Sequence, residues 1–127
     1  MIDPIALGQT KEFILEADKE TENPTIWILG ALDSMQKSQL LTEQDTNEEA
    51  NSVKATHKTL FTIVKYGLKG VKNFGNVEFE TEKIKFMSED IEVLTDSFLK
   101  KIPFFAIAEL SSAIWQENEV SGDLEKN

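Results

Sequence analysis

Cysteine is absent from this 127-residue chain, and histidine occurs only once, at His57. Without cysteine the chain can form no disulfide, no thiolate nucleophile and no cysteine-ligated zinc site. Nucleophilic catalysis usually needs a histidine base beside the nucleophile, and here a single side chain would have to supply it. A chain without cysteine also fits synthesis in a reducing cytosol. These absences disfavour covalent catalysis.

Long apolar runs are absent as well. No run approaches the roughly 20 residues that a membrane-spanning helix needs. The first residues, MIDPIALGQTKEF, contain an early acid and no basic leader, so they do not resemble a signal peptide. We therefore expect no membrane partner, and a protein that stays where it is synthesised.

Basic side chains are outnumbered by acidic ones, 13 against 23, which gives a formal net charge of −10. A field of that sign repels nucleic acids and anionic membranes, so we predict no nucleic-acid partner. The length suits one domain with one hydrophobic core. We predict a single domain over residues 1–127, in which residues 121–127 form an exposed charged tail.

Two short apolar stretches near the N-terminus predict a β-hairpin. They are KEFILEAD (residues 11–18) and PTIWILGALD (residues 24–33), and the polar stretch DKETEN lies between them. The second is apolar on both faces, as in a strand that is covered on both sides. A helix over IALGQTKEFILEA is the alternative, because Ala, Leu, Lys and Glu favour helices.

Two capping boxes predict the starts of two helices. Asp33 with Gln36 opens a helix over SMQKSQLLTEQ, and Thr46 with Glu49 opens a long central helix. The central helix carries an apolar stripe at spacings of three and four: Val53, His57, Leu60, Val64, Leu68 and Val71. A second stripe, one position along, consists of lysines: Lys54, Lys58, Lys65, Lys69 and Lys72.

The stretch YGLKGVKNFGNVEFE (residues 66–80) predicts the end of this helix. Gly67 and Gly70 each cost on the order of 1 kcal/mol in a helix relative to alanine. Asn73 and the following glycine tolerate positive φ. We therefore expect the helix to end between Gly70 and Asn73.

Alternation over residues 77–80 and 83–86 predicts two short strands that are joined near Thr81. Thr95 is expected to cap a helix over DSFLKKI, and Pro103 to end that helix or open the next one. The last helix shows one apolar stripe: Phe104, Ile107, Leu110 and Ile114. Together the elements predict an α+β fold that is mainly α, with an N-terminal hairpin, a long central helix, a second short hairpin and two C-terminal helices.

Motifs with a known chemistry are missing. His57 lies on the apolar stripe, which indicates a boundary residue more than a catalytic or metal-binding one. Residues 45–56 begin like a calcium loop but lack its central glycine and terminal glutamate. The glycines of residues 67–75 match neither the dinucleotide nor the phosphate-loop spacing. We predict no catalytic residue, no cofactor and no metal site.

The lysine stripe is the one sizeable basic stretch, because no acid occurs from Asn51 to Asn76. One interpretation is a solvated helix face that answers the acidic remainder of the fold, or a neighbouring subunit in a homo-oligomer. The other is a docking surface for an acidic partner. For such a partner the candidate residues are Lys65, Leu68, Lys69 and Val71 on the central helix, followed by Ile114 and Trp115 on the last helix.

Four stretches of the chain resemble a family of small proteins from the structural gene clusters of tailed bacteriophages and prophages, described as tail-assembly-chaperone-like. The stretches are an early DP followed by EFILEAD and PTIWILGALD; YGLKGVKNF; LTDSFLKKIP; and AELSSAIWQENEVSGDLEKN. The second is similar to the family's G-L-x-G-W-x-N-F segment, with Val71 where the family usually has tryptophan. Together the four cover most of the chain.

The resemblance implies a non-enzymatic assembly factor, which binds a phage tail or virion protein in the host cytoplasm during morphogenesis. A tape-measure or tail-tube protein is the partner that the family suggests. Two alternatives remain open: a small structural component of the virion, such as a capsid or head–tail junction protein, and an acidic inhibitor of a host protein.

Overall fold

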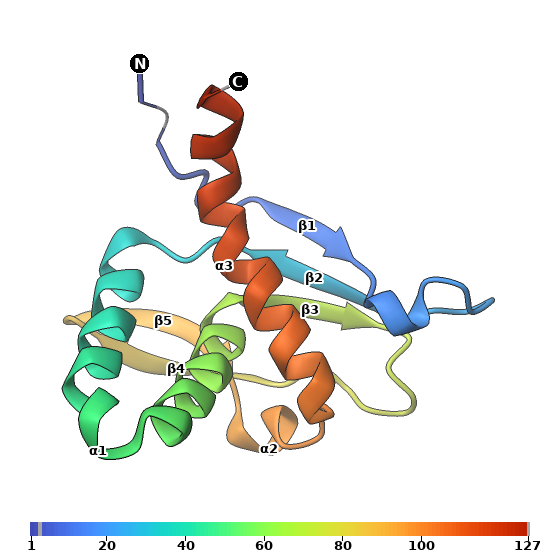
Figure 1. Cartoon of the computed structure of the whole chain (residues 1–127). Helices are drawn as coiled ribbons and strands as arrows, with labels where there is room; N and C mark the ends of the chain where they lie inside the picture. The colour runs from blue at the N-terminus through green and yellow to red at the C-terminus, as the bar shows by residue number, and fades with distance from the viewer. Residues whose placement is uncertain (3, 127) are drawn as a thin grey trace.

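The computed structural model describes the backbone of residues 1–2 and 4–126, and their side chains except those of residues 42–56 and 117–126. The elements in chain order are β1 (Thr10–Phe13), the 3-10 helix η1 (Glu16–Asp18), β2 (Ile26–Gly30), α1 (Ser34–Gly67), β3 (Leu68–Lys72), β4 (Thr81–Phe86), β5 (Glu89–Leu94), α2 (Asp96–Leu99) and α3 (Phe104–Lys126). Strands β1, β2 and β3 form one antiparallel sheet, and β4 pairs with β5 in a second. Figure 1 shows α3 crossing one face of the first sheet, with α1 and the β4–β5 hairpin to one side.

The central strand of the three-stranded sheet, β2, separates a buried face from a more open one. Trp27 and Leu29 are buried, whereas Ile26 and Ile28 are half-buried, as the period of two in a strand requires. Helix α3 packs against β2 and so helps to cover the buried face. The pairing of β1 with β2 agrees with the predicted N-terminal hairpin, and the alternative of a helix in this region is wrong.

The start of α1 is fixed by the predicted capping box. The carboxylate of Asp33 accepts a hydrogen bond from the backbone N–H of Gln36 at 2.7 Å, and the side-chain oxygen of Gln36 accepts one from the N–H of Asp33 at 3.0 Å. Both orphan N–H groups are thereby satisfied. This feature was predictable because it depends on two residues that are close in the sequence.

Both ends of α1 lie next to the same point of the sheet. Leu29, shortly before α1, pairs with Leu68, directly after it. A straight α-helix of 34 residues would span about 50 Å, which would keep its ends far apart. Figure 1 accordingly shows α1 as two limbs, one leaving β2 and one returning to β3.

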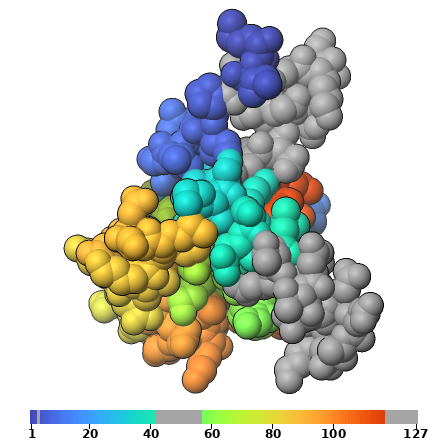
Figure 2. Space-filling view, turned by 90° about the vertical axis from the view of Figure 1, so that its left-hand side faces the viewer, coloured from blue at the N-terminus to red at the C-terminus, as the bar shows by residue number. Residues whose placement is uncertain are grey.

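The β4–β5 hairpin packs on α1 rather than on the three-stranded sheet. Ile84 and Ile91 face each other across the hairpin, and β5 contacts α1. The rings of Tyr66 on α1 and Phe86 on β4 meet edge to face, with centroids 5.9 Å apart. Figure 2 shows the hairpin, in yellow, against the cyan first limb of α1. The hairpin therefore forms one wall of the space beside β3.

The prediction of a mainly helical fold is wrong, because the fold is mixed α+β with two antiparallel sheets. One reason is that the helix ends at Gly67, earlier than expected, and residues 68–72 form a third strand on the first sheet. The apolar spacing of this segment is compatible with a helix, but its pairing with β2 decides its conformation. A partner that is distant in sequence overrides the local pattern here.

The second hairpin lies further along the chain than predicted. Its strands join at Met87 and Ser88, which have φ angles of 49° and 73°, and not near Thr81. The alternation over residues 77–80 has a different origin. Phe79 packs edge to face on Phe98 in α2, with ring centroids 5.2 Å apart, although its segment is no strand.

The structure has one helix where the sequence predicts two, since the backbone is helical from Ser34 to Gly67 and no helix begins at Thr46. The side chains of Thr46 and Glu49 lie outside the described residues. So do the side chains of the predicted tail, residues 121–127. The two C-terminal helices are present, and Thr95 caps α2 by accepting the N–H of Phe98 at 3.1 Å.

The end of α1 packs against α3 at a contact that leaves no space for a side chain. A Cβ atom at Gly67 would lie 2.4 Å from Cγ2 of Ile114, well inside the roughly 3.5 Å of an ordinary carbon–carbon contact. Ile114 is fully buried in the core. The two helices can approach this closely only because the residue is glycine.

The turn after β3 ties the loop between β1 and β2 to the core. Asn73 adopts a left-handed conformation, with φ of 61°, and its amide donates to the carbonyl oxygen of Asn23 at 2.6 Å. Phe74 then places its ring 5.0 Å from that of Trp27 and 6.0 Å from that of Phe98. The stretch YGLKGVKNF thus contacts α3 through Gly67, the β1–β2 loop through Asn73, and Trp27 through Phe74.

We predict that Gly67→Ala lowers the free energy of unfolding by about 1–3 kcal/mol, because the new methyl group overlaps Ile114. Urea denaturation measures this change. Gly70→Ala is the matched control in the same segment, since a Cβ there would lie at an ordinary 3.5 Å from Ile28. Shortening Ile114 to alanine should relieve the overlap. The double variant should therefore lose less than the sum of the two single changes, and strict additivity would contradict the contact.

Candidate functional site

The lysines predicted as one stripe do not share a face. Because α1 ends at Gly67, Lys65 lies on a helix, whereas Lys69 and Lys72 lie on β3. A helix and a strand direct successive side chains differently, so a regular spacing across their junction produces no continuous stripe. The predicted helical stripe is wrong for Lys69 and Lys72, whereas Lys58 and Lys65 both lie on α1. The side chain of Lys54 lies outside the described residues.

Two of these lysines form ion pairs within the fold. The ammonium of Lys65 lies 3.0 Å from the carboxylate of Asp96, the first residue of α2. The ammonium of Lys72 lies 3.3 Å from that of Glu12 on β1. The hydrogen bond and the charge of Lys65 lower the pKa of Asp96. Both lysines therefore form ion pairs with acidic side chains of this chain.

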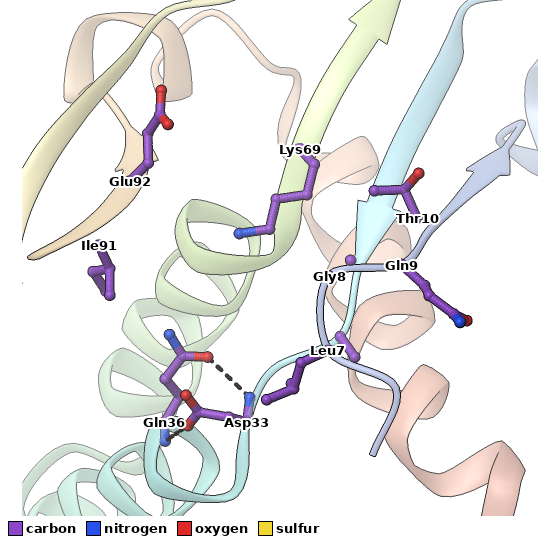
Figure 3. A pocket seen from close by; sticks show the side chains of 11 residues that line it. Leu7, Gly8, Gln9, Thr10, Asp33, Gln36, Lys69, Ile91 and Glu92 are labelled. Atoms are coloured by element: carbon purple, nitrogen blue, oxygen red, sulfur yellow. Dashed lines mark hydrogen bonds between the residues drawn. The ribbon is translucent and has the colours of Figure 1, made fainter. Parts of the chain in front are cut away.

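Lys69 reaches into a pocket of about 470 Å³ between the N-terminal segment, the start of α1 and β5. Its stem lies over Gly30, where a Cβ would be 2.9 Å from its Cγ. Its ammonium donates to the backbone carbonyl of Tyr66 at 2.8 Å. Figure 3 shows this ammonium pointing into the space between Glu92 and Gln36. Lys69 thus occupies the junction of both sheets and α1.

The main charged groups of this pocket are the ammonium of Lys69 and the carboxylate of Glu92. Burial lowers the pKa of Lys69, and the nearby carboxylate of Glu92 opposes that change. Glu92 in turn accepts the hydroxyl hydrogen of Thr81, and Lys69 and Glu92 also line an adjoining hollow of about 380 Å³. A lysine with a lowered pKa can serve as a nucleophile. Here its ammonium already bonds to Tyr66, which favours a structural role.

The apolar candidates differ in their exposure. Leu68 and Ile114 are 2% and 0% exposed, so they belong to the core and present no surface to a partner. Val71 is half-buried and packs against the core. Trp115 is also half-buried, and the ammonium of Lys37 lies 4.3 Å from its ring centroid. Among these four, Trp115 combines partial exposure with a position on an open groove.

This groove follows the line along which the second limb of α1 meets α3, and we call it the α1–α3 groove. It has a volume of about 220 Å³ and is lined by Leu60, Ile63, Ala108, Ser111, Ser112, Trp115 and Gln116. Phe104 lies one helical turn before Ala108 and continues the same line. Its ring is 5.2 Å from that of His57 and 6.1 Å from that of Phe61.

Phe104 and Phe105 are unusually exposed for aromatic residues, at 49% and 59%. The sequence pattern places Phe104 on the buried stripe with Ile107, and for Phe104 that placement is wrong. A usable signal was nevertheless present. Two adjacent residues of a helix lie about 100° apart, so both rings can hardly face one core. An aromatic pair at the start of an amphipathic helix therefore indicates an exposed apolar surface.

Other kinds of site find little support in the described part of the chain. Side chains of His, Asp and Glu form no cluster there that could hold a metal ion. His57 is exposed and packs edge to face on Phe104. None of the helices described combines the length and the apolarity that crossing a bilayer requires.

Comparison with known proteins finds no matching family model, no matching curated protein and no matching solved structure.

Replacing Lys65 with methionine should raise the pKa of Asp96 toward its ordinary value of 3.8, because the charged hydrogen-bond donor is lost. A depressed folded-state pKa stabilises the fold above the ordinary value, and this contribution disappears as the pH falls through the folded-state pKa. Carbon NMR of the Asp96 carboxyl group during a pH titration measures the shift. Lys85→Met, which removes the separate Lys85–Asp90 pair, is the control. An unchanged Asp96 titration in Lys65→Met would contradict the pairing.

Lys69→Met should leave the free energy of unfolding at neutral pH within about 1 kcal/mol of the parent, because a buried ammonium is costly and methionine can keep the stem over Gly30. Burial lowers the folded-state pKa of Lys69. Above that pKa the unfolded chain binds the additional proton, so the stability of the parent relative to Lys69→Met should rise with pH up to about the unfolded-state pKa. Urea denaturation from neutral to alkaline pH tests the sign, with Lys83→Met as the control. A difference that falls with pH would show that the ammonium stabilises the fold.

Proposed function

We propose that this protein is a non-enzymatic assembly factor of a tailed bacteriophage, which binds a tail or virion protein in the host cytoplasm during morphogenesis. One observation carries the binding role. An apolar groove, with exposed aromatic residues one helical turn before it on α3, lies on a chain whose net charge is −10. Exposed apolar surface marks a protein contact, and a high net charge keeps the free protein dispersed.

The chemistry of the described side chains supports binding rather than catalysis. Lys69 bonds to the Tyr66 carbonyl, and Glu92 accepts the hydroxyl of Thr81. His57 packs on the ring of Phe104. The one histidine therefore lies beside an aromatic ring, and the amine of Lys69 is held by a backbone carbonyl, whereas covalent catalysis usually needs a nucleophile that is activated by an adjacent base.

The phage context is supported by the sequence resemblance alone. The four matching stretches include YGLKGVKNF, in which Gly67, Asn73 and Phe74 each make a contact that organises the fold. The resemblance points to a tape-measure or tail-tube protein as the partner. Such a partner is prone to aggregate before it polymerises, and covering its apolar surface would prevent this.

Immunoprecipitation of the tagged protein from infected cells, followed by mass spectrometry, tests the proposal. We expect the parent to recover a phage virion protein, and Phe104→Ala with Phe105→Ala to recover about tenfold less, because aromatic anchors contribute on the order of 2 kcal/mol at protein interfaces. Met87→Ala is the matched control, since Met87 is 51% exposed but lies on the β4–β5 turn. It should behave as the parent.

Purified particles supply the second measurement. An assembly factor should be absent from them, whereas the protein at a fixed stoichiometry in every particle would identify a virion component. Recovery of a basic host protein alone, with strong salt dependence, would identify an inhibitor of the host. Either result would contradict the proposed function.

A further inference from the structure

We infer that the α1–α3 groove receives an amphipathic helix whose polar face is acidic. This inference rests on the proposed function, since it names the chemistry of the partner's binding segment. Three observations carry it: the apolar lining of the groove, its length along α3, and the charges at its Phe104 end.

The lining provides an apolar seat for one face of a helix. Leu60 from α1, together with Ala108 and Trp115 from α3, borders a hollow of about 220 Å³. Ala108 and Ser112 are small, so a partner's side chains can approach the backbone of α3 there. The ring of Trp115 lines the groove, and that of Phe104 lies one helical turn before Ala108 on the same line of α3. A row of small residues between bulky ends suits helix-in-groove recognition.

The line along α3 from Phe104, one turn before the groove, to Trp115 within it sets the length of the partner segment. From Phe104 to Trp115 the chain advances 11 residues along α3, which corresponds to roughly 16 Å at the rise of an α-helix. A partner helix lying along this line would make contact over about three turns. Its apolar side chains would recur every three to four residues, so that one face fills the groove.

The charges at the Phe104 end are positive, in contrast to the protein as a whole. Lys58 follows His57 on α1, and Lys100 and Lys101 stand in the turn before α3. None of these three lysines forms an ion pair with another described residue, unlike Lys65. The sequence has no acid from Asn51 to Asn76 to neutralise this side.

The acids on neighbouring elements are engaged elsewhere. The carboxylate of Glu109 on α3 accepts the backbone N–H of Glu16 at 2.9 Å, and Asp96 pairs with Lys65. The charge of Lys100 also lowers the pKa of Asp96, so that ammonium is partly compensated. Among the described residues, Lys58 and Lys101 have no ion-pair partner, so an acidic helix would be attracted to these ammonium groups and a basic helix would be repelled. Charge complementarity of this kind fixes the choice of partner and the association rate more than the affinity.

Two synthetic peptides with the same apolar face test the inference by fluorescence anisotropy. Each is an amide-capped helix of about 16 residues, with leucine and phenylalanine at positions that repeat every three to four residues. One carries glutamate on its polar face, and the other carries lysine. We expect the glutamate peptide to bind at least about tenfold more tightly near 0.05 M salt, and this preference to shrink near 0.5 M salt.

Variants assign the preference to the groove. Lys100→Glu with Lys101→Glu should abolish or reverse the preference for the glutamate peptide, whereas Lys83→Glu, at an exposed position on β4, should not. Ser112→Tyr should block the groove from an exposed position on α3 and weaken both peptides. Circular dichroism confirms that each variant is folded. If Ser112→Tyr fails to fold, Phe104→Ala replaces it as the test, and we expect this variant to bind both peptides more weakly.

Equal affinity for the two peptides would overturn the inference. So would a Lys83→Glu variant that loses the preference for the glutamate peptide as fully as the variant with Lys100→Glu and Lys101→Glu. So would sedimentation equilibrium showing a dimer of the free protein that Ser112→Tyr disrupts, because a second copy would then occupy the groove. The proposed function fails separately. If the parent recovers a virion protein from infected cells while both peptides bind equally, the assembly role stands and the acidic helix does not.

Discussion

The contact between Gly67 and Ile114 determines the path of the chain from α1 to β3. A side chain at position 67 would begin 2.4 Å from a fully buried isoleucine, so only glycine allows α1 to end against α3. Because α1 ends there, Leu68 can pair with Leu29 and the chain can continue as the third strand of the sheet. The stem of Lys69 then covers Gly30. The close approach of α1 to α3 and the start of the β2–β3 pairing thus occur at the same junction.

The same junction explains why the basic stretch did not become a surface stripe. Side chains on a helix advance by about 100° per residue, and those on a strand by about 180°. The switch after Gly67 therefore sends Lys65, Lys69 and Lys72 to three different places: α2, the space between the sheets, and β1. Each finds an acceptor or an acid of this chain. This arrangement favours the interpretation that the lysines answer the acidic remainder of the fold.

The structural features that the sequence predicts correctly, such as the helix caps, depend on residues that are close together in the sequence. The cap at Asp33 and the cap at Thr95 each depend on residues three positions apart. Strand β3 depends instead on β2, from which it is separated by the whole of α1. The turn at Met87 and Ser88 requires positive φ from two residues that seldom adopt it. The adjacent rings of Phe104 and Phe105 indicate from the sequence that an aromatic side chain is exposed. Which part of the fold leaves Phe104 uncovered depends on where α1 returns, and this cannot be read from the local pattern.

The groove and the core share their walls, so binding and folding must be coupled. Trp115 lines the groove while its neighbour Ile114 fills the core, and Ile63 is both a core residue and a lining residue. The Gly67 contact that seats the end of α1 on Ile114 therefore also positions the groove. A helix that enters the groove binds only the folded arrangement of α1 and α3, and it stabilises the fold in proportion to its saturation. A change that loosens the junction at Gly67 would therefore weaken binding of the proposed helix without altering the residues that line the groove.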